Sequence, residues 1–250
     1  MSIAILSAMS EENASLVSQM RNVECIEIGR RHYHQGELWG QDVVVVFSHW
    51  GKVAAASTTT LLIDRFKVSE IIFTGVAGGI DRTLNIGDIV VATDLYQHDM
   101  DARPIIERHE IPLLGVAAMP SSVPRRGQLL EAARRFVDSQ LLDALSADTI
   151  SEFSLHSPKV LSAPVASGDQ FISTEQRVDD IRSRLPGVAC VEMEGASVAQ
   201  VCTEFGIPFS VVRTISDAAN EQAGIDFPKF IRSVAQIYSL NIVKNLLAGS

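Results

Sequence analysis

The pattern that most constrains the fold is a series of short apolar runs separated by longer amphipathic segments. The runs are rich in valine and isoleucine, as in "DVVVVFS", which is typical of strands covered on both faces. Strands are expected at 2–8, 42–48, 70–75, 87–94, 159–169, 188–194 and 208–217. Helices are expected at 11–20, 52–66, 126–145, 173–185, 195–205 and 227–247. The alternation predicts an α/β fold, a three-layer α/β/α sandwich with a central mixed, largely parallel sheet.

Composition excludes several classes of partner. The 250 residues show no composition break or internal repeat, so a single domain over 1–250 is expected. Acidic residues outnumber basic ones by 30 to 21, which disfavours binding to nucleic acid or to an anionic membrane. The N-terminal "MSIAILSAMSEE" has neither the basic start of a signal peptide nor the length of a membrane span. A cytoplasmic protein is therefore expected.

Neither the cysteines nor the histidines form a metal-binding or disulfide pattern. Cys25, Cys190 and Cys202 are odd in number and include no CxxC pair, so buried reduced thiols are expected. The six histidines include no HExxH motif, and His98 is interpreted with Asp99 as a polar contact of a loop. The sequence therefore predicts no metal site and no cofactor.

The segment 95–124 is the one long stretch without clear helical or strand periodicity. Loops of this length in compact domains are usually functional or lie at an interface. We expect 95–124 to be such a loop.

Polar residues follow several predicted strands, at the edge where α/β sheets bind ligands. Glu12 comes soon after the first strand, as either a catalytic carboxylate or an acid that only stabilises a first helical turn. In "FTGVAGGI", Gly78 permits either a simple chain reversal or close approach to a ligand. Neither GxGxxG nor GxxxxGK[ST] occurs, so a phosphate cradle is weakly supported.

Two later strand ends carry an aromatic residue or a pair of charges. Phe171, in "ASGDQFI", suits stacking on a flat heterocycle that pairs with the backbone, with core packing as the alternative. Arg213 and Asp217 stand four residues apart after an apolar run, where a structural ion pair is the alternative to a functional role. Together these strand ends favour a ligand site.

The segment "VEMEG" places two glutamates in an apolar setting. In a strand, Glu192 and Glu194 project to one face and Met193 to the other. Buried carboxylates are costly unless they find hydrogen-bond donors. A salt-bridged structural pair is one interpretation, and a ligand site at Glu194 is the other.

Six blocks of the sequence, taken in order, resemble the 5′-methylthioadenosine/S-adenosylhomocysteine nucleosidases of the purine nucleoside phosphorylase superfamily. The blocks are "AMSEE", "SHWGKVAAA", "TGVAGGIDRTLNIGDIVV", "ASGDQFI", "VEMEGASVAQVC" and "VVRTISD". The resemblance covers nearly the whole chain and is weakest over 100–158. It implies a nucleoside phosphorylase-like fold and hydrolysis of the N-ribosidic bond of an adenine nucleoside by water.

The resemblance also implies roles for the carboxylates. Glu12 would be the general base for water, and Asp217 the acid that protonates adenine at N7. Glu194 would hold the ribose 2′- and 3′-hydroxyls, with Met193 against the sugar. An Asp that acts as acid near neutral pH needs a raised pKa, which Arg213 would oppose if it paired with Asp217 directly. We therefore hypothesise that Arg213 instead orients Glu12 and the water.

The remaining positions implied by the resemblance would form the walls of the pocket. Phe171 would stack on adenine while the backbone of Ile172 reads its edge, and Phe227 would close over the base. The other expected pocket residues are Met9, Ala77 and Gly78.

Two residues depart from the family pattern. Many members have Ser where this chain has Val76, so another hydroxyl, such as that of Ser216, would have to orient the acid. Trp50 replaces a smaller apolar residue beside the expected 5′-alkylthio pocket. Its bulk leaves open the relative preference for methylthioadenosine and S-adenosylhomocysteine.

Three alternative functions stay open. A phosphorylase of the same superfamily would need arginines that grip phosphate, whereas Glu12 would repel phosphate and suits water. A related nucleoside such as aminofutalosine would fit a hydrolase equally. A non-catalytic nucleoside-binding module is possible in principle, because fold alone does not give function. The resemblance and the loop at 95–124 also predict a homodimer whose partner subunit edges the site.

Overall fold

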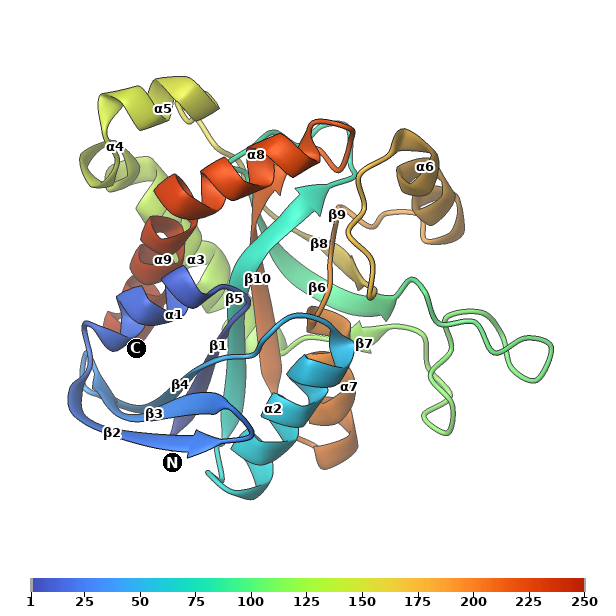
Figure 1. Ribbon diagram of the computed structural model, residues 1–250, viewed down its shortest axis with the longest axis horizontal. Coiled ribbons are helices and arrows are strands. Elements are labelled where there is room, and N and C mark those ends of the chain that lie inside the picture. The colour runs from blue at the N-terminus through green and yellow to red at the C-terminus, as the bar shows by residue number, and fades with distance from the viewer. Residues whose placement is uncertain (1, 250) are drawn as a thin grey trace.

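A mixed β-sheet forms the centre of the molecule, and helices cover it on both sides (Figure 1). The computed structural model describes residues 2–249. Its strands are β1 (Ile3–Ser7), β2 (Arg21–Ile28), β3 (Arg31–Leu38), β4 (Gln41–Phe47), β5 (Glu70–Gly79), β6 (Ile89–Gln97), β7 (Met119–Pro120), β8 (Val160–Ser167), β9 (Cys190–Glu192) and β10 (Phe209–Asp217). Within the described range they join in the order β10-β6-β8-β9-β5-β1-β4-β3-β2, with β7 beside β6.

The helices occupy most of the intervals between strands. They are α1 (Ser10–Val17), α2 (Lys52–Asp64), α3 (Val123–Ser139), α4 (Leu141–Ala144), α5 (Ala147–Phe153), α6 (Glu175–Arg184), α7 (Gly195–Phe205), α8 (Ala223–Phe230) and α9 (Gln236–Ala248). A π-helical segment, η1 (Ile231–Ala235), joins α8 to α9. The single helix expected over 227–247 is therefore interrupted, and the one expected over 126–145 ends at Ser139 before α4 begins.

Five strands of the sheet close into a ring. Strand β5 pairs with β10 in parallel and with β9 in antiparallel orientation, and β6 and β8 complete the path between these two partners. The α/β class is confirmed, and the ring departs from a simple three-layer sandwich, whose middle layer would be an open sheet. Lateral pairing between strands distant in the chain decides this closure, and residue periodicity does not reveal it.

The near-continuous apolar runs are explained by burial of both faces of the sheet. In β4, Val43 and Val45 belong to the hydrophobic cluster that contains α3 and α9 residues, whereas Val44 and Val46 belong to the cluster of α2 and α7. Successive side chains of a strand point to opposite faces, so each face needs its own apolar set. The prediction of strands covered on both faces is confirmed.

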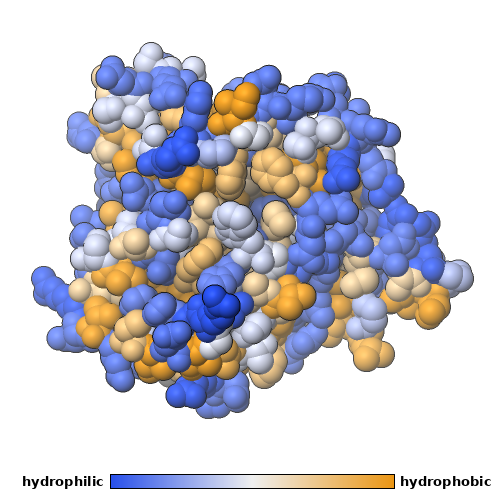
Figure 2. Space-filling model, in the orientation of Figure 1, coloured by the Kyte–Doolittle hydropathy of each residue, from blue (hydrophilic) through white to orange (hydrophobic). Residues whose placement is uncertain are grey.

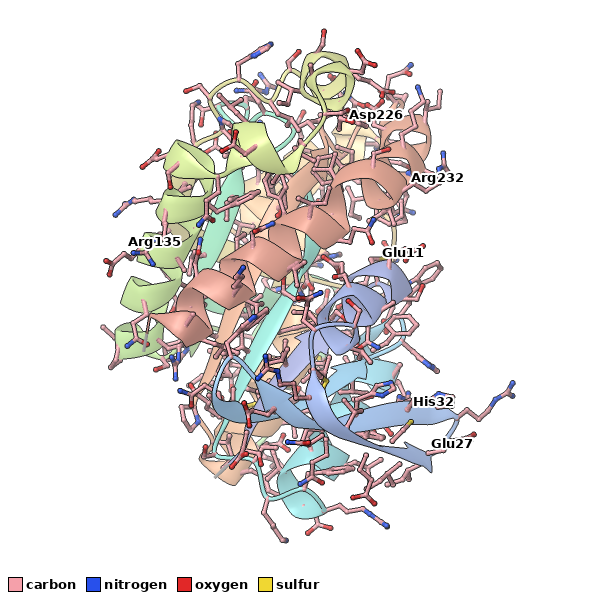
Figure 3. The ribbon with its side chains drawn as sticks, turned by 90° about the vertical axis from the view of Figure 1, so that its left-hand side faces the viewer. Glu11, Glu27, His32, Arg135, Asp226 and Arg232 are labelled. Atoms are coloured by element: carbon pink, nitrogen blue, oxygen red, sulfur yellow. The ribbon has the colours of Figure 1, made fainter. Side chains whose placement is uncertain are left out.

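The hairpin of β2 and β3 was not expected from the sequence. Strand β2 is exposed along most of its length and so lacks the apolar run by which strands were recognised. Glu27 and His32 project from this hairpin into solvent (Figure 3), with 3.9 Å between Oε2 and Nε2. Cys25 lies on β2 and is exposed, so the prediction of a buried thiol is wrong there, although it is confirmed for Cys190 and Cys202. All three thiols are free.

The segment expected to be a loop at 95–124 is shorter in the structure. Strand β6 extends to Gln97, β7 occupies two residues, and α3 begins at Val123. The part between β6 and β7 extends away from the body of the molecule (Figure 1). Ile105 and Leu113 on this loop are 88% and 105% exposed, and Figure 2 shows apolar atoms near its outer ends.

Among residues 2–249, no helix combines the length and apolar character needed to cross a bilayer.

Candidate active site

A cavity of about 450 Å³ opens where several strands of the sheet end. Its walls come from the turns after β1, β4 and β8, from the ends of β5, β9 and β10, and from α8. The lining residues are Ala8, Met9, Trp50, Val76, Ala77, Gly78, Gln170, Phe171, Ile172, Val191, Glu192, Met193, Glu194, Ser216, Asp217, Gly224 and Phe227. A mostly apolar cleft with a few carboxylates is typical of small-molecule sites.

The structure brings together all but two of the residues singled out from the sequence. Met9, Trp50, Ala77, Gly78, Phe171, Ile172, Met193, Glu194, Ser216, Asp217 and Phe227 line the cavity. Glu12 and Arg213 are not among its lining residues, and both side chains are fully buried. Sequence reasoning did not single out Ala8, Gln170, Val191 or Gly224. Gln170 directly precedes Phe171, so neighbourhood in the chain was the available signal.

Asp217 ends β10 and faces the cavity with a carboxyl group that is nearly inaccessible to solvent. The Ser216 hydroxyl donates to Oδ2 at 2.8 Å, and the Ala219 N–H donates to Oδ1 at 2.9 Å. A Cβ on Gly78 would lie 3.0 Å from Oδ1, so glycine permits this close approach. Burial raises the pKa of Asp217 and the charge of Asp226 adds to the rise, while the two hydrogen bonds oppose it. Asp217 is thus set up to hold a proton.

Arg213 pairs with Glu192 rather than with Asp217. Its Nη2 lies 2.7 Å from Glu192 Oε2, and its guanidinium carbon lies 4.0 Å from the centre of the Phe73 ring. The structural ion pair considered for Arg213 and Asp217 is therefore wrong. A register shift between Ile215 and Asp217 breaks the alternation of β10 after Arg213. The positive charge of Arg213, which would have lowered the pKa of Asp217, is paired with Glu192 instead.

The two glutamates of "VEMEG" have different surroundings. Glu192 accepts hydrogen bonds from the Gly195 N–H at 2.8 Å, from Arg213 and, in a very short contact, from Ser167. It thereby satisfies the first N–H groups of α7, where negative charge is favourable. Glu192 belongs to a structural network, although it also borders the cavity.

Glu194 also lines the cavity, and its carboxyl has fewer hydrogen-bond partners than that of Glu192. The Gly51 N–H donates to its Oε1 at 2.8 Å. Gly51 has φ +88°, a conformation that favours glycine, and the turn after β4 depends on it. Burial raises the pKa of Glu194, and the nearby charge of Glu192 raises it further. Of the pair, Glu194 is the member available to a ligand.

Glu12 lies in the first turn of α1 and is completely buried. The Ser239 hydroxyl donates to its Oε1 at 2.5 Å, whereas Oε2 is buried without a hydrogen-bond partner. Burial raises the pKa of Glu12 to about 7, and the Ser239 hydrogen bond and the charge of Arg213 limit the rise. A helix-stabilising acid would keep contact with solvent, as the half-buried Glu11 does on the outer side of α1 (Figure 3). The geometry therefore disfavours the purely local role.

Two aromatic rings stand together at the cavity. Phe171 and Phe227 have centroids 5.7 Å apart at an interplanar angle of 71°. Phe171 is 45% exposed, so core packing is not its role. Ile172, next to it, is buried. An accessible ring beside apolar walls suits a flat heterocycle.

Trp50 stands at the rim of the cavity rather than deep inside it. Its side chain is 62% exposed, and its Nε1–H donates to the Ala8 carbonyl at 3.0 Å. This hydrogen bond orients the indole over the turn that precedes Glu12. Across residues 2–249 no group of three or more His, Cys, Asp or Glu side chains is placed to hold a metal ion.

Known proteins are similar to this chain over nearly its full length. A sequence profile of the phosphorylase superfamily matches residues 2–248. A 5′-methylthioadenosine/S-adenosylhomocysteine nucleosidase of Bacillus velezensis is 34% identical over 248 residues, which cover 99% of this chain and 98% of the relative.

Two solved structures are also similar to this chain over its full length. The crystal structure of the 5′-methylthioadenosine/S-adenosylhomocysteine nucleosidase of Neisseria meningitidis, in complex with methylthio-immucillin-A, has a TM-score of 0.88 and 31% identity. The match covers 100% of this chain and 99% of that one. The native futalosine hydrolase of Helicobacter pylori strain 26695 has a TM-score of 0.84 and 31% identity, covering 100% and 98%.

Proposed function

The chain belongs to the 5′-methylthioadenosine/S-adenosylhomocysteine nucleosidase family of the phosphorylase superfamily, and from this premise we propose how its cavity works. The family resemblance read from the six sequence blocks is confirmed. The protein is an N-glycosyl hydrolase that cleaves the N-ribosidic bond of these two nucleosides and releases adenine. The observation that best supports our assignment of roles is the position of Asp217, whose buried carboxyl has a raised pKa and lines the same cavity as the exposed Phe171 ring.

Asp217 is the proposed general acid. As the bond between C1′ and N9 breaks, its electron pair moves onto adenine, and the Asp217 carboxyl delivers a proton to N7. The departing base therefore leaves as a neutral molecule. Burial raises the pKa of Asp217, which favours the protonated form that a general acid needs.

Glu12 is the proposed general base. Water attacks C1′ from the side away from the leaving base, and its proton passes to the unpartnered Oε2 of Glu12. Arg213 makes no direct hydrogen bond to Glu12, but its positive charge lowers the pKa of that carboxyl. The hypothesis that Arg213 orients Glu12 and the water stays a prediction. Its Nε has no partner and is the donor available for this purpose.

The remaining cavity residues are proposed to hold the substrate. Glu194 accepts hydrogen bonds from the ribose 2′- and 3′-hydroxyls, and Met193 packs against the sugar. Phe171 and Phe227 enclose the adenine ring. Carboxylates near the sugar also stabilise the positive charge that develops there as the bond breaks.

The reaction is expected to need no phosphate. Release of adenine from 5′-methylthioadenosine should proceed at the same rate with and without added phosphate, because none of the residues that line the cavity is a lysine or arginine able to bind phosphate. An absorbance assay of adenine release in phosphate-free buffer measures this. Strict dependence on phosphate would make the protein a phosphorylase instead.

Substrate preference within the proposed class depends on the 5′ side of the cavity. The futalosine hydrolase among the structural relatives keeps a related nucleoside open as an alternative substrate. We propose that Trp50, on the cavity rim, restricts the size of the 5′ substituent. A non-catalytic binding module is no longer a favoured interpretation, because the relatives with high coverage are nucleosidases.

We propose that the protein is a homodimer. The exposed Ile105 and Leu113 on the loop between β6 and β7 support this, since burial of large apolar side chains against a partner subunit is favourable. Sedimentation at low protein concentration should give twice the 27.2 kDa mass of one chain. A monomer with full activity would contradict the proposal.

A further inference from the structure

A chain of two hydroxyl groups leads from the centre of the sheet to Glu12. Thr74 on β5 and Ser239 on α9 are both buried, and their Oγ1 and Oγ atoms lie 2.8 Å apart. Ser239 Oγ in turn lies 2.5 Å from Glu12 Oε1. Hydrogen bonds thus link three elements that are remote in sequence, and the last of these bonds reaches the Glu12 carboxyl.

The direction of these hydrogen bonds follows from the chemistry of the groups. An ionised Glu12 has no proton to give, so the single proton of Ser239 must point to Oε1. Thr74 then donates to Ser239, because Ser239 has only acceptor capacity left for it. Oε1 is occupied in this arrangement, and Oε2 is the oxygen without a partner.

We propose that Ser239, supported by Thr74, is a positioning residue for the general base: it holds Oε1 of Glu12 and leaves Oε2 to accept the proton of water. This inference rests on the proposed role of Glu12. A change of rotamer in Glu12 would move Oε1 and Oε2 away from these positions. The hydroxyl from α9 restricts that rotation and also stabilises the ionised form of the carboxyl.

Other groups around Glu12 leave the effect of Ser239 visible. The charged groups that act on the carboxyl are Arg213 from β10, which lowers its pKa, and Glu11 from its own helix, which raises it. Both remain in place when Ser239 is altered. Removal of the hydroxyl therefore shifts the pKa of Glu12 upward, because a hydrogen bond to the charged form is lost.

The test is the pH dependence of turnover in Ser239→Ala. The acidic limb of the kcat profile is expected to move up by about one pH unit, since a hydrogen bond to a charged group has about that effect. Turnover at pH 6 should fall by about tenfold, and the deficit should shrink as the pH rises. Thr74→Val should shift the limb in the same direction by less, whereas Thr74→Ser, which keeps the hydroxyl, should not shift it.

Ser210→Ala is the matched control, because Ser210 is another buried serine and its hydroxyl has no partner. Its limb should coincide with that of the unaltered protein. A uniform loss of turnover at every pH in Ser239→Ala, with the limb in place, would overturn the proposal. If thermal melting shows that Ser239→Ala is unfolded, Thr74→Val decides: a shifted limb supports the proposal and an unshifted limb overturns it.

A separate variant tests the premise that Glu12 is the base. Glu12→Gln with substantial turnover would remove the proposed function itself. Loss of turnover in Glu12→Gln together with an unshifted limb in Ser239→Ala and Thr74→Val would remove only the role of Ser239. The two failures are therefore distinguishable.

Discussion

Asp217→Asn is expected to lower kcat for 5′-methylthioadenosine by roughly 10²–10⁴-fold, the usual contribution of a general acid. Asparagine keeps the shape of the side chain, and its single oxygen can still accept from the Ala219 N–H, but it has no proton to deliver to N7. The apolar walls and the Phe171 ring are unchanged, so adenine should still bind. Turnover and calorimetric binding of adenine, measured on the same preparation, separate the two effects.

Asp226→Asn is the control for this prediction. Asp226 lies on α8 outside the cavity lining, and its charge acts on Asp217 only from a distance. Its removal should change turnover by less than about threefold, because the charge is partly screened by solvent. Unchanged turnover in Asp217→Asn would refute the role of Asp217 as acid.

Glu12→Gln is expected to reduce kcat by a similar factor, roughly 10²–10⁴-fold, because an amide cannot take a proton from water. Wild-type activity should also fall as the pH drops through about 7, where Glu12 takes up a proton. Steady-state assays across that range measure both. Glu11→Gln, the same substitution one position earlier on the outer side of α1, should retain turnover (Figure 3).

The Glu12→Gln variant should also be more stable than the unaltered protein in alkaline solution. The pKa of Glu12 rises from 4.5 to about 7 on folding, so its contribution to stability is fully present below 4.5 and is lost as the pH rises through 7. At pH 8 the buried charge would cost up to about 3 kcal/mol, because each tenfold change in proton affinity corresponds to about 1.4 kcal/mol. Thermal melting at pH 8 should favour the variant, and at about pH 4, below both pKa values, the two should agree. A variant less stable at both pH values would contradict this expectation.

Much of the fold could be predicted because apolar periodicity depends on local residue order. The runs at β1, β4 and β5 were recognised since both of their faces are buried. The hairpin of β2 and β3 was missed for the opposite reason, because β2 is exposed and carries no apolar run. The ring of five strands was missed because residues of β5 and β10 pair across more than a hundred positions of chain.

The residues of the site were predictable in kind but not in pairing. The family blocks place Glu12, Glu194 and Asp217 near strand ends. In the structure, Glu194 and Asp217 both line the cavity. The partner of Arg213 was not predictable, since a guanidinium in a strand can reach several acids. Only the tertiary structure shows that Arg213 forms its ion pair with Glu192.

The sequence by itself determined the α/β class, the family and the identity of the acidic residues at the strand ends. These follow from short-range patterns and from blocks whose order can be read along the chain. Only the tertiary structure decided which carboxylates are paired and which are free. Ser239 meets Glu12 from 227 positions away, and Arg213 is committed to Glu192. Such contacts depend on how helices and strands pack together, because hydrogen bonds form between neighbours in space.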